Sequence, residues 1–117
     1  MHAYMVITLH TADDVNQLCS GGFCTQMQLI YRDSKSSPSI ALQHFKELYH
    51  SNGIQVFAGL VTSAETQAVA SYAKDNELEV ALLSASSTAS QLCDYSDILV
   101  RLSMDDKAQA EVIFDVM

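Results

Sequence analysis

Four short apolar runs, spaced about 20 to 28 residues apart, constrain the fold of this chain more than any other sequence feature. Each run is rich in Val, Ile, Leu or aromatic residues and is too short to form a typical helix. This composition is typical of strands that are buried on both faces of a sheet. The runs cover residues 26–31, 54–60, 79–83 and 98–102.

Two of the segments between these runs show helix-start signals followed by apolar residues at helical spacing. Ser37 is an expected N-cap because Pro38, whose fixed backbone angle suits the first helical position, follows it directly, and Gly53 marks the end of that helix. Thr62 and Glu65 have the spacing of a capping box, in which each side chain accepts from the backbone N–H of the other. Both segments are predicted to be helices.

A third helix is predicted after the last run. Asp105 and Asp106 place negative charge where the dipole of a helix favours it. We expect the buried side of this helix to consist of Ala108, Val112, Ile113 and Val116. Residues 1–18 fit either a strand or a helix, and we favour a helix.

The alternation of strands and helices predicts right-handed βαβ units. The expected fold class is therefore α/β, with a Rossmann-like parallel sheet of about four strands and helices on both faces. The chain has one Pro, four Gly and no linker-like stretch, so residues 1–117 are expected to form a single domain. Functional sites in such sheets lie beyond the carboxyl ends of the strands.

The charge balance excludes two classes of partner. The chain has 6 Lys and Arg residues against 14 Asp and Glu residues, and its net charge of −8 provides no positive field for a nucleic acid or an anionic membrane. No apolar run approaches the roughly 18 to 20 residues that span a bilayer. Residues 5–9 are also too short for the apolar part of a secretory signal. We therefore expect no nucleic-acid partner and no direct membrane insertion.

The cysteines and histidines form no recognisable catalytic or metal-binding pattern. The three cysteines, whose spacing matches neither a redox pair nor a zinc site, are interpreted as ordinary thiols. They are Cys19, Cys24 and Cys93, and a bridge between the first two in an oxidising compartment is the alternative. The histidines have no adjacent carboxylate or metal-like grouping and are interpreted as surface residues; they are His2, His10, His44 and His50. Because no nucleophile elbow, Walker loop or dinucleotide fingerprint is present either, we predict a protein that is not an enzyme and uses no metal or cofactor.

Polar residues cluster after two of the predicted strands. Residues 84–90, Ser-Ala-Ser-Ser-Thr-Ala-Ser, follow the third run and offer hydroxyl and backbone N–H groups to a small polar ligand. Ser63 follows the second run in the first turn of a helix, where unpaired N–H groups and the helix dipole attract a carboxylate. The two strand ends are expected to form one notch that favours an anion.

Five sequence blocks follow one another from about Asp13 to the end of the chain. They are Asp14-Val15-Asn16 with Gly21-Gly22, LIYRDSKSSPSIALQHFKELY from Leu29, GLVTSAETQAVASYA from Gly59, LLSASSTASQL from Leu82 and VRLSMDDKAQA from Val100. In this order and spacing they resemble the amino-terminal lobe of the type I periplasmic-binding-protein superfamily. Within it, the similarity is greatest to branched-chain amino-acid-binding proteins and to the extracellular ligand-binding regions of receptors.

The resemblance implies a site for an amino-acid-like ligand, because in that family the lobe forms half of a cleft that closes on such a solute. Ser63 resembles the serine whose hydroxyl and backbone N–H hold the ligand carboxylate. Thr88 resembles the threonine whose N–H meets that carboxylate and whose hydroxyl meets the ammonium group. Ser86 falls where a backbone carbonyl accepts from the ammonium group, and Ser87 is its neighbour in the same loop.

Two charged residues after the fourth run also match recurring residues of the family. We interpret Arg101 as a partner in an ion pair near the hinge and Asp106 as a helix cap. Both roles are structural and involve no contact with the ligand.

The resemblance implies a solute-binding protein that serves an ABC-type membrane transporter, or a receptor ectodomain that passes on a signal, in the periplasm or outside the cell. The alternatives are a cytoplasmic effector-sensing regulatory domain of the same fold and an α/β interaction domain that binds no ligand. The family's first strand would precede Met1 and its second lobe would follow Met117. We therefore expect residues 1–117 to form an incomplete amino-terminal lobe.

Overall fold

The computed structural model describes residues 29–117 of the chain. The chain divides into two compact units, Met1–Asp33 and Ser34–Met117. The helix predicted in residues 1–18, and the cysteines Cys19 and Cys24, lie outside the described residues.

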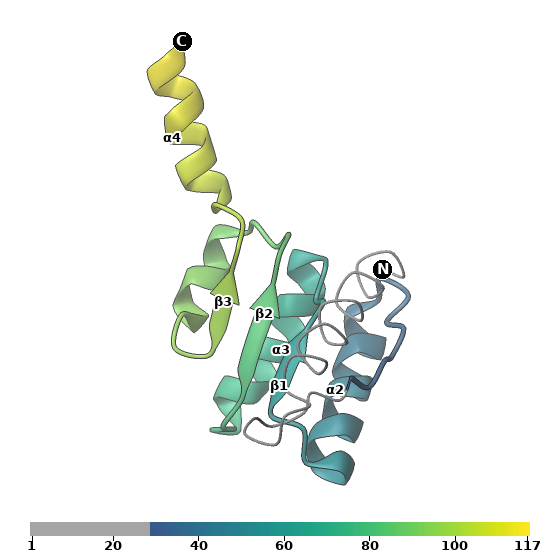
Figure 1. Ribbon diagram of the computed structural model, residues 1–117. Helices are drawn as coiled ribbons and strands as arrows, with labels where there is room; N and C mark the ends of the chain where they lie inside the picture. Colours follow the sequence, from purple (N-terminus) through teal and green to yellow (C-terminus); the bar gives the residue numbers. More distant parts are fainter. Residues whose placement is uncertain (1–28) are drawn as a thin grey trace, which may run out of the picture. The chain divides into compact units, whose positions relative to one another are not determined.

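Helices and strands alternate along the second unit, as the sequence predicts (Figure 1). In chain order the elements are helix α2 (Pro38–Asn52), strand β1 (Val56–Ala58), helix α3 (Ser63–Asp75), strand β2 (Ala81–Ser84), the short 3-10 helix η1 (Ser90–Tyr95), strand β3 (Leu99–Arg101) and helix α4 (Asp106–Val116).

The strands form a parallel sheet with β2 in the centre, which confirms the predicted α/β class. Phe57 is paired with Leu82 between β1 and β2, and Leu83 with Val100 between β2 and β3. The described residues contain three strands, whereas the sequence analysis predicted about four. Residues 29–31, the described part of the first predicted strand, are not in a strand. The second run ends early as a strand because Gly59 has a positive φ of 94°, outside the extended region.

The core lies on one face of this sheet. Side chains alternate along β2, so Leu82 and Ser84 are buried while Ala81 and Leu83 are exposed. The buried apolar side chains that pack against Leu82 come from α2, α3, η1 and β3, and they are Ala41, Phe45, Val69, Ala70, Ala73, Leu92 and Leu99. On the opposite face, Val100 beside Leu83 is 54% exposed. We expected helices on both faces; within the described residues, the helices that pack on the sheet cover this one face.

Helix α2 begins and ends where the sequence predicts, although its N-cap works differently. Ser37 has the extended backbone of an N-cap and precedes Pro38, but its side chain makes no capping hydrogen bond. Its hydroxyl instead lies 3.0 Å from the hydroxyl of Ser39. At the other end, Gly53 adopts the left-handed conformation with φ 67° and donates its N–H to the last carbonyls of the helix, a conformation that favours glycine.

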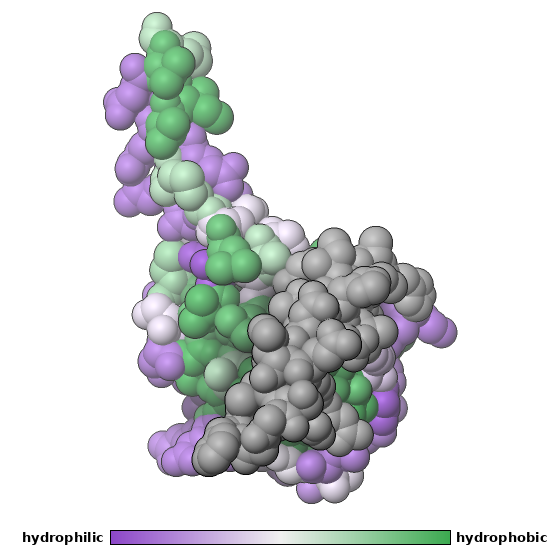
Figure 2. Space-filling view, viewed as in Figure 1, coloured by the Kyte–Doolittle hydropathy of each residue, from purple (hydrophilic) through white to green (hydrophobic). Residues whose placement is uncertain are grey.

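Helix α4 buries none of the side chains that we predicted to be buried. Ala108 is half-buried, and Val112, Ile113 and Val116 are all exposed, as the apolar surface of this helix in Figure 2 shows. The prediction was wrong because an apolar stripe indicates which side of a helix can pack but supplies no partner, and α4 packs extensively against no other described element. None of the helices within residues 29–117 has both the length and the apolar character needed to cross a bilayer.

Candidate ligand-binding site

The two polar segments predicted to form a notch do meet in the structure. Strands β1 and β2 are neighbours, so the segments that follow their carboxyl ends lie at the same edge of the sheet. The hydroxyl oxygen of Ser63 accepts hydrogen bonds from the backbone N–H groups of Thr88 and Ala89, each at 3.2 Å. These contacts join the start of α3 directly to the loop after β2.

Ser63 is the first residue of α3, where backbone N–H groups have no carbonyl one turn earlier to bond. The predicted capping box is confirmed: the Thr62 hydroxyl accepts from the N–H of Glu65 at 3.2 Å, and the Glu65 carboxylate accepts from the N–H of Thr62 at 3.1 Å. Among the described residues, the N–H groups of Ser63 and Ala64 have no partner. Two donors at the positive end of the helix dipole therefore have no acceptor within residues 29–117.

Ser86 and Ser87 are adjacent in sequence but occupy different environments. Ser86 is exposed, and its hydroxyl donates to the carbonyl of Val61 at 2.6 Å. Ser87 is fully buried, with its hydroxyl 2.6 Å from those of both Thr66 and Ser84. The Ser87 side chain therefore faces the interior and connects the loop to β2 and α3.

Thr88 is half-buried, and both of its backbone polar groups have partners. Its N–H donates to Ser63, and its carbonyl accepts from the N–H of Asp106 at 2.8 Å. Its hydroxyl has no hydrogen-bond partner among the described residues. This hydroxyl is a polar group that a ligand can use.

Glu65 anchors the start of α3 through a contact that the sequence analysis did not find. Its side chain is buried, and one carboxylate oxygen accepts from the hydroxyl of Ser34, which is also buried. The other oxygen accepts from both the N–H and the hydroxyl of Thr62. Ser34 lies 31 residues before Glu65, so only the capping half of this arrangement has a local signal in the sequence.

Arg101 contacts the loop after β2, an arrangement that the interpretation of this residue as part of an ion pair near a hinge did not include. Its Nη1 donates to the carbonyls of Ser87 at 3.4 Å and Ala89 at 3.0 Å, and its Nη2 donates to the sulfur of Cys93 at 3.1 Å. Cys93 is a free thiol, in agreement with its interpretation as an ordinary thiol, and it is exposed.

The cap of α4 is Asp105, whereas we predicted Asp106. The Asp105 carboxylate accepts from the N–H of Ala108 at 2.7 Å and from the thiol of Cys93 at 3.3 Å. Both bonds stabilise the charged carboxylate and lower the pKa of Asp105 below its ordinary value of 3.8. The bond from Ala108 has the larger effect, and the bond from Cys93 the smaller one. Asp106 instead donates its backbone N–H to Thr88.

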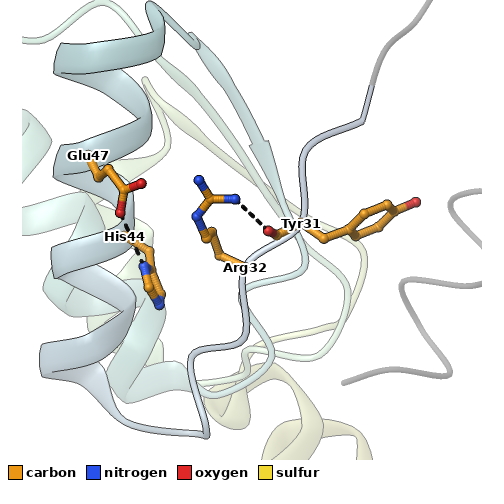
Figure 3. Close-up of polar contacts among 4 residues, drawn as sticks. All are labelled: Tyr31, Arg32, His44 and Glu47. Atoms are coloured by element: carbon orange, nitrogen blue, oxygen red, sulfur yellow. Dashed lines mark hydrogen bonds and ion pairs between the residues drawn. The ribbon is translucent and has the colours of Figure 1, made fainter.

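The remaining polar contacts of the described residues do not suggest a second site. On α2, His44 Nδ1 lies 3.7 Å from the Glu47 carboxylate, and within the first unit Arg32 donates to the carbonyl of Tyr31 at 2.8 Å (Figure 3). The prediction that His44 is a surface residue without a nearby carboxylate was wrong: it is half-buried and lies one helical turn from an acid. Within residues 29–117, no group of His, Cys, Asp and Glu side chains could hold a metal ion.

Residues 9–117 match the sequence model of the family described as "Receptor family ligand binding region". The chain belongs to this family. The match begins near the start of the five sequence blocks and includes the Ser63–Thr88 contact. The resemblance to type I periplasmic-binding proteins and receptor ligand-binding regions, predicted from those blocks, is thereby confirmed.

The fold of this chain is also similar to that of a solved structure from Streptococcus pneumoniae. That structure is the branched-chain amino acid transporter substrate binding protein LivJ in complex with isoleucine, with a TM-score of 0.68 and 25% sequence identity. The match covers 81% of this chain and 27% of LivJ, so the chain spans about a quarter of the length of LivJ. No curated protein sequence matches the chain. The family and LivJ are both ligand-binding rather than enzymatic.

Proposed function

We propose that this chain supplies one wall of a cleft that binds a small amino-acid-like ligand. The observation that carries the proposal is the convergence of the Thr88 and Ala89 N–H groups on the hydroxyl of Ser63, at the N-terminus of α3. A carboxylate placed here meets several N–H donors and the favourable end of a helix dipole.

The same site has acceptors for an ammonium group. The Thr88 hydroxyl is without a partner among the described residues, and the Ser86 carbonyl lies in the same loop. Donors at one end and acceptors at the other suit a zwitterion, and these neutral groups require no formal charge of the protein to be buried. Ser63, Ser86 and Thr88 form the proposed contact set, while the buried Ser87 supports the loop from behind.

The biological setting is part of the proposal. The match covers 27% of LivJ, and we propose that the chain forms part of the amino-terminal lobe of a larger two-lobed binding protein. Such a protein would deliver its ligand to a membrane transporter or pass on a signal as a receptor ectodomain, in the periplasm or outside the cell.

A titration followed by nuclear magnetic resonance tests this site and detects even weak binding. The uniformly labelled chain is titrated with L-isoleucine, the ligand in the LivJ structure, and then with each other common amino acid. We expect the amide signals of Ser63 and Thr88 to shift with at least one amino acid. The shift should be much smaller with 3-methylpentanoate, which lacks the ammonium group, and with 2-methylbutylamine, which lacks the carboxylate.

Two substitutions test the contacts themselves. Thr88→Ala should weaken binding by roughly 1 to 3 kcal/mol, because the ammonium group loses a buried acceptor. Ser51→Ala removes an exposed hydroxyl near the end of α2, outside the polar segments; it is the control and should bind like wild type. Equal affinity of Thr88→Ala and wild type, or no response of the Ser63 and Thr88 amides to any amino acid, would refute the proposed site.

A further inference from the structure

The backbone of residues 87–89 is held on two sides by different parts of the fold. On one side, the N–H groups of Thr88 and Ala89 point to Ser63 on α3. On the other side, the three carbonyls of Ser87, Thr88 and Ala89 all accept hydrogen bonds from residues 101–106. No carbonyl of this short segment is left without a partner.

The planar trans peptide bond makes these two sides dependent on each other. In each peptide unit, the carbonyl of one residue and the N–H of the next lie in one plane and point in opposite directions. The direction of the Ser87 carbonyl therefore sets the direction of the Thr88 N–H. The Thr88 carbonyl, held by the N–H of Asp106 at 2.8 Å, sets the Ala89 N–H in the same way.

Two side chains hold the Ser87 carbonyl. Arg101 Nη1 donates to it at 3.4 Å and the Ser103 hydroxyl donates at 3.1 Å. The same Arg101 nitrogen also reaches the Ala89 carbonyl at 3.0 Å, so one guanidinium group bridges both ends of the segment. A guanidinium group is planar and has five donors in fixed directions, which suits it to fixing two carbonyls at once.

We propose that Arg101 is a positioning residue for the ligand carboxylate. It acts from behind the loop: by holding the Ser87 carbonyl, together with Ser103, it turns the Thr88 N–H toward the site. Its hydrogen bonds go to the loop carbonyls and to Cys93, and its charge acts on Asp105, so its role in the site is indirect. This inference rests on the proposed function, because it assigns a role within the same site.

The first measurement needs no ligand. Hydrogen exchange of the Thr88 and Ala89 amides is followed in the full chain carrying Arg101→Gln, with the fold checked by circular dichroism. We expect Thr88 exchange to accelerate about tenfold, since its peptide unit loses one of two carbonyl anchors. Lys74→Gln is the matched control. Lys74 also donates to a backbone carbonyl, that of Asp94 at 2.6 Å, but Asp94 lies outside residues 87–89. This variant should leave Thr88 exchange unchanged.

The second measurement is the affinity for whichever amino acid shifts the Thr88 amide in the wild-type chain, beginning with L-isoleucine. We expect about a tenfold weaker affinity for Arg101→Gln and an affinity within about threefold of wild type for Lys74→Gln. Arg101→Lys keeps the charge but loses the planar bridge, so it should recover only part of the affinity. Full recovery by Lys would overturn the positioning role, because it would show that the charge alone matters.

If Arg101→Gln does not fold, Ser103→Ala removes the other donor to the Ser87 carbonyl and leaves the guanidinium group in place. It should accelerate exchange at Thr88 more than at Ala89, because only the Ser87 carbonyl loses a bond. Unchanged Thr88 exchange in both variants, or wild-type affinity in a folded Arg101→Gln, overturns the inference. A wild-type chain that responds to no amino acid overturns the proposed function instead, and the exchange data separate the two failures.

Discussion

Helices α3 and α4 begin in the same way but have different surroundings. Thr62 caps α3 by accepting from the N–H three residues later, and Asp105 caps α4 with the same geometry. Yet α3 buries Glu65, Thr66, Val69, Ala70 and Ala73, whereas α4 buries no side chain. The comparison shows that a cap determines where a helix starts, while its burial depends on elements far away in sequence.

This difference has consequences for stability. A fully buried Val contributes about 1.5 to 3 kcal/mol to folding stability relative to an exposed one. The buried side chains of α3, such as Val69, therefore contribute to the stability of the core. Helix α4 has 11 residues, and isolated helices shorter than about 12 to 15 residues are marginal in water. Its helical state therefore depends strongly on its cap.

Substituting one valine in each helix tests the difference in burial between α3 and α4 most directly. Val69→Asp in α3 places a charge at a position with 0% exposure and should destabilise the fold by more than about 3 kcal/mol or unfold it. Val112→Asp in α4, where the side chain is 52% exposed, should change the stability by no more than about 0.5 kcal/mol. Thermal melting followed by circular dichroism measures both. A large loss for Val112→Asp would show that α4 is packed in solution.

The cap of α3 provides a smaller effect. Thr62→Ala should cost about 1 kcal/mol of folding stability, because the N–H of Glu65 loses its acceptor. Thr62→Ser keeps the hydroxyl and serves as the control. Urea unfolding measures the difference, and equal midpoints for Ala and Ser would mean that the Thr62 hydroxyl contributes nothing to the start of α3.

The cap of α4 should respond to pH, with the smallest effect of the three. The folded-state pKa of Asp105 lies below 3.8, so the stabilising carboxylate is fully present above that value and is lost as the pH falls through the lower folded-state pKa. Helicity of α4, followed by the amide signals of residues 106–116, should therefore decrease at acidic pH. In Asp105→Asn, which caps without a charge, this dependence should be absent. A persistent pH dependence in Asp105→Asn would assign it to another acid.

Local signals in the sequence predicted the parts of the fold that depend on nearby residues. The Pro38 start, the Gly53 end and the Thr62–Glu65 capping box each involve residues within a few positions of one another, and all three are present. The parallel order of the sheet followed from the alternation of elements. The meeting of Ser63 with the loop after β2 followed in turn from neighbouring strand ends.

Contacts between distant residues were not predictable in the same way. The bond between Ser34 and Glu65 and the bonds from Arg101 to the loop carbonyls join residues whose spacing has no periodic signal. The exposure of Leu83 and Val100 was also unexpected, because a fully apolar run predicts burial on both faces. In each case the sequence does not indicate which element of the fold lies next to the residue.

The hydrogen bonds from Thr88 and Ala89 to Ser63 affect how selective the proposed site can be. These two N–H groups have the Ser63 hydroxyl as their acceptor, so a ligand that bonds to them exchanges one acceptor for another. A neutral oxygen gains little from such an exchange, whereas a carboxylate forms charge-assisted bonds that are about twice as strong. The Ser63 hydroxyl thus acts as an internal competitor that esters and amides displace poorly and free acids displace well.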